Sequence, residues 1–331
     1  MDSVKVDTSG SPFTFDLPPP GKVTREAGIF KAGRPTHTGP DSGGSVTEYS
    51  HSRLSSYESC PRKFKYRYVD QIKVDTEGVE AFMGKRVHEI LERLYHHVAR
   101  NGRPPSLAQV LERYRKDWSR SWHEKVQIVR KENPPEYYLE RGARGLENYY
   151  RTWYPFTSGE TVALEERLRL ELDGDGRYKM LGIVDRIVRQ GDGVFEIHDY
   201  KTSASLPPQR QVDQDRQLAL YQIGLEQTYP DVQQVELVWH YLIFNKTLRS
   251  RRSPETLESL RKATIQLIDA IEAEREFPAR PGPLCRWCDY AGICPEAPAS
   301  VRSAAPDRIA DPGLLVPDAD EQARQLSLLG D

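Results

Sequence analysis

An acidic and a basic side chain, Asp199 and Lys201, stand two positions apart near the end of residues 194–202. This stretch, Val-Phe-Glu-Ile-His-Asp-Tyr-Lys-Thr, is rich in β-branched and aromatic residues, which predicts a strand. Residues two apart on a strand point to the same face, so the carboxylate and the ammonium project together from its end. The pair suits phosphodiester hydrolysis, because the carboxylate can hold a hard divalent cation while the lysine orients or deprotonates the attacking water. An exposed salt bridge would produce the same pair.

A histidine could add an imidazole to such a site. His88 lies beside the apolar stripe of a helix predicted from residue 84 to residue 100. A histidine in this position is either a metal ligand or a residue at the core edge with a satisfied hydrogen bond. Glu92 lies one helical turn further on the same face, and we do not assign it to the site.

Three predicted strands surround the acidic residues. They cover residues 161–172, 178–189 and 194–201, and glycine–aspartate turns separate them. Such spacing predicts an antiparallel meander. Asp185 falls within its middle strand, next to the strand that carries Asp199.

The second half of the chain predicts a helix, a strand and another helix. The helix covers residues 211–225 and carries Gln217 and Tyr221 one turn apart. The apolar run 235–244 is typical of a buried strand, and residues 254–276 follow a helical period. The order helix, three strands, helix, strand indicates an α/β fold.

Four cysteines are widely separated in the chain. Cys60 lies far upstream, whereas Cys285, Cys288 and Cys294 follow C-x2-C-x5-C spacing. Four cysteines in a long chain without a visible signal peptide favour a metal site over disulfides. Four thiolates can hold zinc or an iron–sulfur cluster, and the residues alone leave both open.

Two stretches combine aromatic residues with a helical pattern. Residues 55–61 predict a helix start with a serine at its cap, and basic and aromatic residues then alternate through residues 62–73. This mixture fits either a grip on single-stranded nucleic acid or an amphipathic helix. Residues 106–153 predict a helical insertion whose tryptophans and tyrosines form an aromatic core, with a stacking wall for nucleic acid as the alternative.

Composition excludes several classes of protein. The 331 residues carry a net charge of -2, so any nucleic-acid contact must be a local groove. No apolar run is long enough to span a membrane, and we expect a cytoplasmic protein. No Walker-type phosphate loop is present, so ATP-driven unwinding would require a separate helicase.

Both ends of the chain lack apolar periodicity. Residues 1–48 are rich in Pro, Gly, Ser and Thr and predict a disordered arm, and residues 297–331 predict a disordered acidic tail. Within that tail, Gln325, Leu326, Leu328 and Leu329 resemble the peptide by which bacterial DNA enzymes bind the replication sliding clamp. The alternative is a chance match.

Taken together, these residues resemble the RecB-like branch of the PD-(D/E)xK nuclease superfamily over residues 49–296. Within that branch they are most similar to its iron–sulfur members, which include the AddB nuclease domain and the CRISPR adaptation exonucleases. The resemblance implies a restriction-endonuclease-like core with a four-cysteine iron–sulfur staple.

The resemblance also assigns roles to residues. It implies that His88, Asp185, Asp199 and the Tyr200 carbonyl bind Mg2+ or Mn2+, and that Lys201 assists the attacking water. Gln217 and Tyr221 match a helix motif that positions the nucleic acid and the lysine. The cysteines Cys60, Cys285, Cys288 and Cys294 match ligands of a [4Fe–4S] cluster.

The expected activity is therefore a metal-dependent DNA exonuclease, acting on single-stranded DNA in repair, recombination or replication and leaving 5′-phosphate ends. The alternative is a non-catalytic iron–sulfur module that binds DNA or is tethered to the clamp. The sequence argues against this alternative, because every position of the active-site set is filled.

Overall fold

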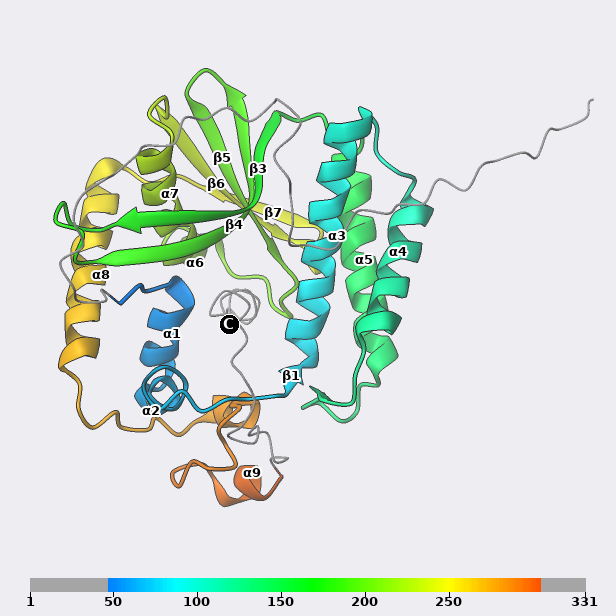
Figure 1. Cartoon of the computed structure of the whole chain (residues 1–331). Coiled ribbons are helices and arrows are strands. Elements are labelled where there is room, and N and C mark those ends of the chain that lie inside the picture. The colour runs from blue at the N-terminus through cyan, green and yellow to red at the C-terminus, as the bar shows by residue number, and fades with distance from the viewer. Residues whose placement is uncertain (1–46, 305–331) are drawn as a thin grey trace, which may run out of the picture. The chain divides into compact units, whose positions relative to one another are not determined.

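A five-stranded mixed sheet lies at the centre of residues 47–304, the part of the chain that this computed structural model describes (Figure 1). The strand order is β3–β4–β5–β6–β7, and all neighbours are antiparallel except β5 and β6. The strands are β3 Glu160–Glu171, β4 Lys179–Gly191, β5 Val194–Lys201, β6 Gln234–Tyr241 and β7 Lys246–Ser250. The predicted three-strand meander thus forms one side of a mixed α/β fold.

The parallel pair β5–β6 needs a crossover connection, and two helices supply it. They are α6, Gln209–Val212, and α7, Arg216–Thr228. The sequence predicted one continuous helix here, and that prediction was wrong. The Asp215 side chain accepts a hydrogen bond from Leu218 N over 3.1 Å, so α7 begins with its own cap after a turn.

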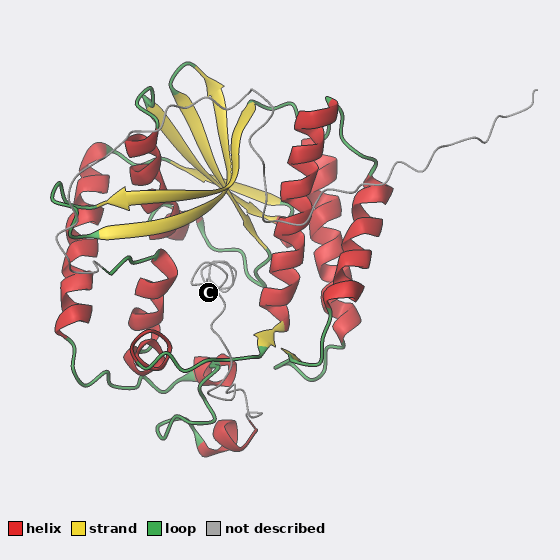
Figure 2. Cartoon of the chain, viewed as in Figure 1, coloured by secondary structure: helices red, strands yellow, loops and turns green. Residues whose placement is uncertain are grey.

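The first core lies where α7 packs across strands β3 to β6. Helices α1, His51–Ser59, and α8, Pro254–Ala273, pack against α7 on this side of the sheet (Figure 2). Phe195 and Ile197 of β5 point into this core, so Asp199 and Lys201, with the same alternation, belong to the same face. Other members include Leu168, Ile187, Leu218, Leu220, Leu237 and Trp239.

The second core lies among three helices that pack on one another. They are α3, Val79–Asn101, α4, Leu107–Ser121, and α5, Pro135–Trp153. Tyr200 of β5 belongs to this core, which also contains Val87, Ile90, Leu91, Leu94, Trp118, Tyr138, Tyr149 and Tyr150. Most aromatic side chains of residues 106–153 are therefore packed inside the protein. The short strands β1, Glu77–Gly78, and β2, Val126–Gln127, pair in parallel nearby.

The first helices of the described chain differ from the sequence prediction. Helix α1 begins at His51, and its cap is Ser50, whose side chain accepts from Arg53 N over 3.2 Å. Ser55 lies within the helix and is not its cap. Helix α2, Pro61–Phe64, and the π-helix η1, Lys65–Val69, follow after a break at Cys60, because proline disfavours helical geometry in the preceding residue.

Residues 62–73 fit the amphipathic alternative better than a surface whose aromatic rings are open for stacking on nucleic acid. Phe64 is buried in the first core, and Tyr66 lies against Tyr290 with ring centroids 5.5 Å apart. Lys65 pairs with Asp70 over 2.6 Å. The remaining short elements are the 3-10 helices η2, Leu242–Phe244, and η3, Pro283–Trp287, and helix α9, Ala299–Ala304.

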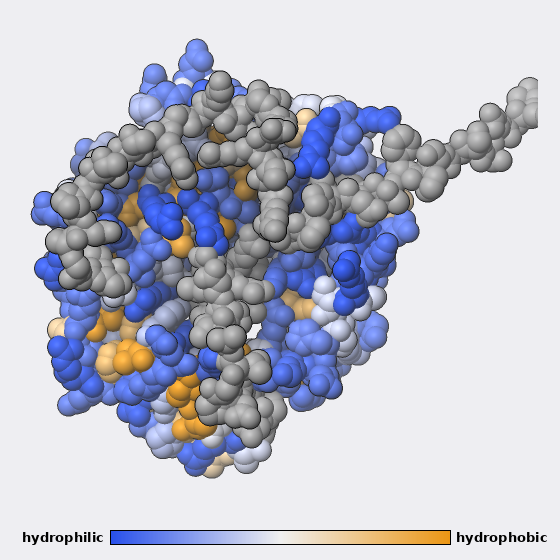
Figure 3. Space-filling model, in the orientation of Figure 1, coloured by the Kyte–Doolittle hydropathy of each residue, from blue (hydrophilic) through white to orange (hydrophobic). Residues whose placement is uncertain are grey.

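Hydrophilic residues predominate on the face shown in Figure 3, and hydrophobic residues gather in its lower part. Among residues 47–304, no helix is both long enough and apolar enough to cross a membrane.

Candidate active site

Asp199 and Lys201 occupy the end of β5, and both side chains are nearly buried. Lys201 Nζ lies 3.0 Å from Asp199 Oδ2, and it donates a hydrogen bond to Gln217 Oε1 over 2.9 Å. The adjacent strand supports this geometry, because β6 pairs with β5 along its whole length and ends beside Lys201. The predicted pair therefore lies on one face of the strand.

Three side chains from different elements converge next to this pair. His88 from α3, Glu165 from β3 and Asp185 from β4 place ligand atoms within 4.8 Å of one another. In the described part of the chain, this is the one group of at least three histidine, cysteine or acidic residues that meets the distance. An imidazole and two carboxylates are suitable ligands for a hard or borderline divalent cation.

The backbone of Tyr200 connects the two sets of residues. Tyr200 N donates to Asp185 Oδ2 over 2.7 Å, and the Tyr200 carbonyl lies 2.8 Å from His88 Nε2. The other ring nitrogen of His88, Nδ1, lies 3.3 Å from Asp185 Oδ1. The strand end thus brings a carbonyl oxygen, a histidine and an aspartate to one place.

Charge and burial shift the protonation of these groups. Burial lowers the pKa of His88, but the carboxylates of Asp185, Glu165 and Asp199 together outweigh it and raise that pKa to about 9. Burial raises the pKa of Asp199 to about 6, although Lys201 opposes this. Burial likewise lowers the pKa of Lys201, and Asp199 and Asp215 raise it above its ordinary value. In the protein without metal, Lys201 is therefore an ammonium that donates hydrogen bonds.

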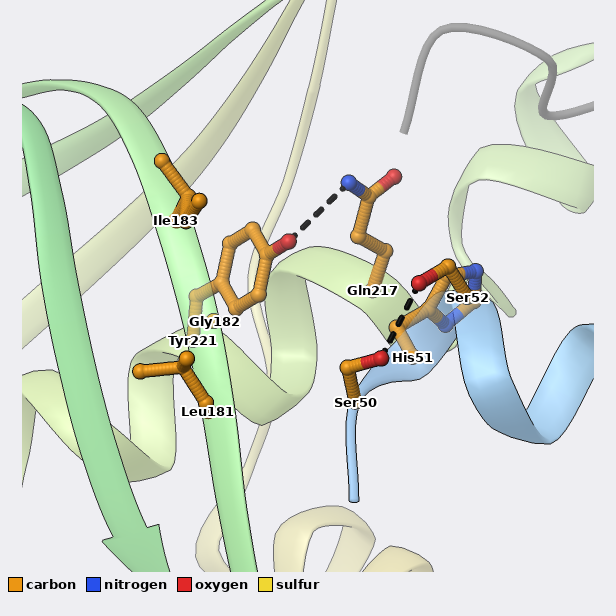
Figure 4. A pocket seen from close by; sticks show the side chains of 8 residues that line it. All are labelled: Ser50, His51, Ser52, Leu181, Gly182, Ile183, Gln217 and Tyr221. Atoms are coloured by element: carbon orange, nitrogen blue, oxygen red, sulfur yellow. Dashed lines mark hydrogen bonds between the residues drawn. The ribbon is translucent and has the colours of Figure 1, made fainter. Parts of the chain in front are cut away.

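Gln217 and Tyr221 lie one turn apart on the buried side of α7. Gln217 Nε2 donates to the Tyr221 hydroxyl over 3.2 Å (Figure 4). The ring of Tyr221 lies over Gly182 of β4, where an added Cβ would come within 2.3 Å of the ring. A small cavity adjoins this contact and is lined by Ser50, His51, Ser52, Leu181, Gly182, Ile183, Gln217 and Tyr221.

The residues present fit a divalent cation. Asp199 Oδ2 is buried and lacks a hydrogen bond of good geometry despite its closeness to Lys201. A buried carboxylate whose charge is balanced by a single ammonium is costly, and a cation would stabilise that charge further. Together with His88, Glu165, Asp185 and the Tyr200 carbonyl, it supplies the oxygen-rich ligand set that Mg2+ or Mn2+ prefers.

Glu165 is the site residue that sequence reasoning missed. It lies between Leu164 and Glu166, which pair with Arg186 and Val184, so the strand register places it opposite Asp185. Its φ of 47° is unusual for a residue other than glycine in a strand, and such strain is concentrated at functional sites. The sequence offered one signal for Glu165: the alternation of apolar and polar residues along the predicted strand is interrupted at Glu165–Glu166.

The four cysteines lie in neighbouring segments, and none forms a disulfide. Arg280 N donates to Cys60 Sγ over 3.4 Å, and Arg62 Nε donates to the Phe277 carbonyl over 2.9 Å, so the segment leading to Cys285 packs on the start of the chain's folded part. Burial raises the pKa of Cys288 to about 11, and Cys60 contributes in the same direction. Within residues 47–304, the thiolates do not converge to the spacing of ligands around a single ion.

The peptide Gln325, Leu326, Leu328 and Leu329 lies outside the described residues, as does nearly all of the predicted arm 1–48.

Comparison with known proteins assigns the chain to a family. The sequence profile of the PD-(D/E)XK nuclease superfamily matches residues 48–295, so the chain belongs to that superfamily. Its members use divalent metals, which agrees with the candidate metal ligands His88, Glu165 and Asp185. The RecB-like, iron–sulfur branch is a finer assignment than this match provides.

Other comparisons add little to that assignment. No match was found among curated proteins. A solved structure described as "Crystal structure of SSO0001" has a TM-score of 0.25 and 15% sequence identity, covering 74% of this chain and 94% of that one. The family assignment rests on the profile match.

Proposed function

We propose that this protein is a metal-dependent exonuclease that hydrolyses single-stranded DNA in repair, recombination or replication. Membership in the nuclease superfamily supports phosphodiester cleavage. The observation that carries the proposal is the meeting of His88, Glu165 and Asp185 with the Asp199–Lys201 pair at the end of β5.

The residues divide into binding and positioning roles. His88, Glu165, Asp185, Asp199 and the Tyr200 carbonyl would hold one or two Mg2+ or Mn2+ ions. A bound ion supplies Lewis acidity, which offsets charge on the phosphate and lowers the pKa of a bound water. The Lys201 ammonium donates a hydrogen bond to the attacking water or to the phosphate oxygen that gains charge. Gln217 holds Lys201 in place over 2.9 Å.

The test is digestion of end-labelled single-stranded DNA by anaerobically purified protein. Mn2+, Mg2+ and EDTA are compared in parallel, and Asp199→Ala and Lys201→Ala serve as variants. Shortening that needs metal and disappears in both variants would support the proposal, and 5′ and 3′ labels would give the polarity. Wild-type activity in the variants would exclude this active site. Binding without cleavage would favour the non-catalytic DNA-binding module.

We also propose that Cys60, Cys285, Cys288 and Cys294 hold a [4Fe–4S] cluster that joins the beginning and end of the nuclease domain. The packing of residues 277–296 against α2 and the segment after η1 supports this, because Arg62 also contacts Glu296 over 3.6 Å and Tyr290 donates to the Ile72 carbonyl over 3.1 Å.

The cluster is tested by measuring iron, acid-labile sulfide and zinc in protein purified without oxygen. Four iron atoms for each chain are expected, with loss in Cys288→Ser and a lower unfolding temperature. If the protein instead contains one zinc ion for each chain and no iron, the cysteines form a zinc site and the cluster proposal is wrong.

We further propose that the C-terminal peptide binds a bacterial sliding clamp, with Gln325 and the leucines Leu326, Leu328 and Leu329 in a hydrophobic groove. Substitution of Gln325 and Leu328 by alanine should abolish binding to immobilised clamp while nuclease activity remains. Equal binding by the variant would refute the proposal.

We also propose that a separate helicase supplies the single strands. Co-purification of a helicase with this protein would test that proposal.

A further inference from the structure

One tyrosine of the helical insertion is exposed close to the candidate active site. Most aromatic residues between positions 106 and 153 are buried in the second core. Tyr137, in the first turn of α5, is 44% exposed. Tyr154, just after the last residue of the same helix, is 60% exposed. The two tyrosines therefore occupy opposite ends of one helix.

Arg141 connects Tyr137 to the strand end that carries the catalytic lysine. Its Nη2 donates to the Ser203 carbonyl over 2.9 Å, and its Nη1 donates to the Tyr137 hydroxyl over 3.4 Å. Ser203 follows Lys201 by two residues, a backbone distance of at most about 7 Å. A single guanidinium therefore bridges the loop after β5 and the exposed tyrosine.

The ring of Tyr137 is held in a defined orientation. It meets Tyr138 edge to face, with centroids 5.2 Å apart and planes at 88°. Tyr138 is itself buried, and Arg141 holds the hydroxyl. The Tyr137 ring is thus held by the Tyr138 ring and, at its hydroxyl, by Arg141. A side chain that is already held in this way loses little conformational entropy when another flat group stacks on it.

A nucleobase is the flat group that this position fits. The strand end beside Ser203 carries the groups that would act on a phosphodiester, so the nucleotides next to the reacting phosphate must pass close to this loop. Aromatic side chains stack on bases of any sequence, and arginine favours the adjacent phosphates. The loop residue Leu206, which is 39% exposed, adds apolar surface after Ser203.

We propose that Tyr137 stacks on a base of the bound single strand, and that Arg141 sets the position of its ring relative to Lys201. This inference rests on the proposed function. It adds a contact that grips substrate without taking part in the chemical step. Because stacking requires an exposed base face, the contact favours single strands over the interior of a duplex.

The experiment compares Tyr137→Ala with Tyr137→Phe and with Tyr154→Ala. Binding of a fluorescent thymidine oligonucleotide is measured with Ca2+ in place of the catalytic ion, and kcat and KM are measured with Mn2+ or Mg2+. We expect Tyr137→Ala to weaken binding and raise KM about tenfold, with kcat nearly unchanged. Tyr137→Phe keeps the ring and should stay within about twofold of wild type.

The matched control is Tyr154→Ala, which removes an exposed tyrosine from the other end of α5 and should leave KM unchanged. A 2-aminopurine base moved along the oligonucleotide should be quenched at one position in wild type, and Tyr137→Ala should lose that quenching. If Tyr137→Ala and Tyr154→Ala bind alike, the inference fails while the nuclease proposal stands. If wild type neither binds nor cleaves single-stranded DNA, the proposed function itself fails.

Discussion

Lys201 and Gln217 are joined by a hydrogen bond of 2.9 Å in which the lysine ammonium donates to the amide oxygen. The amide nitrogen of Gln217 donates to the Tyr221 hydroxyl over 3.2 Å, so the amide oxygen is turned toward the lysine. Both α7 residues are buried against the sheet. The glutamine therefore acts as an orienting group between a rigid tyrosine and the lysine.

Gln217→Ala should lower kcat more than it raises KM, because Lys201 would lose the partner that fixes its position. A misplaced catalytic group costs roughly 100-fold in rate. Steady-state kinetics on single-stranded DNA provide the measurement, with Gln227→Ala near the end of the same helix as control. A rise in KM with unchanged kcat would instead mean that Gln217 contacts the nucleic acid.

Glu165→Gln should increase the concentration of Mn2+ or Mg2+ that gives half-maximal activity by about tenfold. The amide keeps the shape of the side chain but removes the charge that attracts the cation. Calorimetric titration of the metal into the DNA-free protein measures the same loss without catalysis. Glu166→Gln, the next residue of β3, is the control and should bind metal as wild type does.

Gly182→Ala should destabilise the protein and displace Tyr221. The added Cβ would lie 2.3 Å from one ring carbon and 2.6 Å from another, and the buried ring has little room to move. Overpacking of this kind costs about 1–3 kcal/mol of unfolding free energy. Urea denaturation measures the loss. Gly174→Ala, where the added atom meets nothing within 4 Å, should be neutral, and equal stability of both variants would contradict the predicted clash.

Stability should fall as the pH drops from 7.5 to 5.5. Burial lowers the pKa of His198 to about 3 and that of His240 well below 6.5, while the unfolded chain binds protons at the ordinary value. At His198 and His240 the unfolded state therefore gains protons first, and each of the two contributes a loss of about 1 kcal/mol of stability over this interval. His88 and Asp199, whose pKa values are raised in the folded protein, oppose this loss and reduce its net size. Thermal unfolding at several pH values tests this.

His240→Gln provides the comparison for that pH dependence. The two imidazoles share a contact of 2.7 Å between His198 Nδ1 and His240 Nε2. Replacing one removes a titrating group, so the slope of unfolding free energy against pH should decrease by roughly half. An unchanged slope would mean that acidic side chains cause the pH dependence.

The strands of the meander and their acidic residues could be predicted because the information is local. Alternation of apolar residues and two glycine-containing turns define β3, β4 and β5, and they place Asp185 next to the strand of Asp199. Because side chains alternate between the two faces of a strand, Lys201 lies on the same face of β5 as Asp199. These inferences need no knowledge of distant contacts.

The parts that escaped prediction depend on the fold as a whole. Glu165 becomes a candidate ligand through the register of β3 against β4 and through a positive φ, and neither is encoded by its immediate neighbours. Strand β7 was missed because it lies at the sheet edge and Leu248 is its single apolar residue. The break before α7 depends on Asp215, which a continuous helical pattern conceals.

The candidate site lies at the boundary between the two cores. His88 comes from the helix that forms the second core, whereas Lys201, Gln217 and Tyr221 face the first. A cation bound by both sides would join residues of the two cores at one point. Saturating Mn2+ should therefore raise the unfolding temperature, since a ligand that binds only the folded state stabilises that state by mass action.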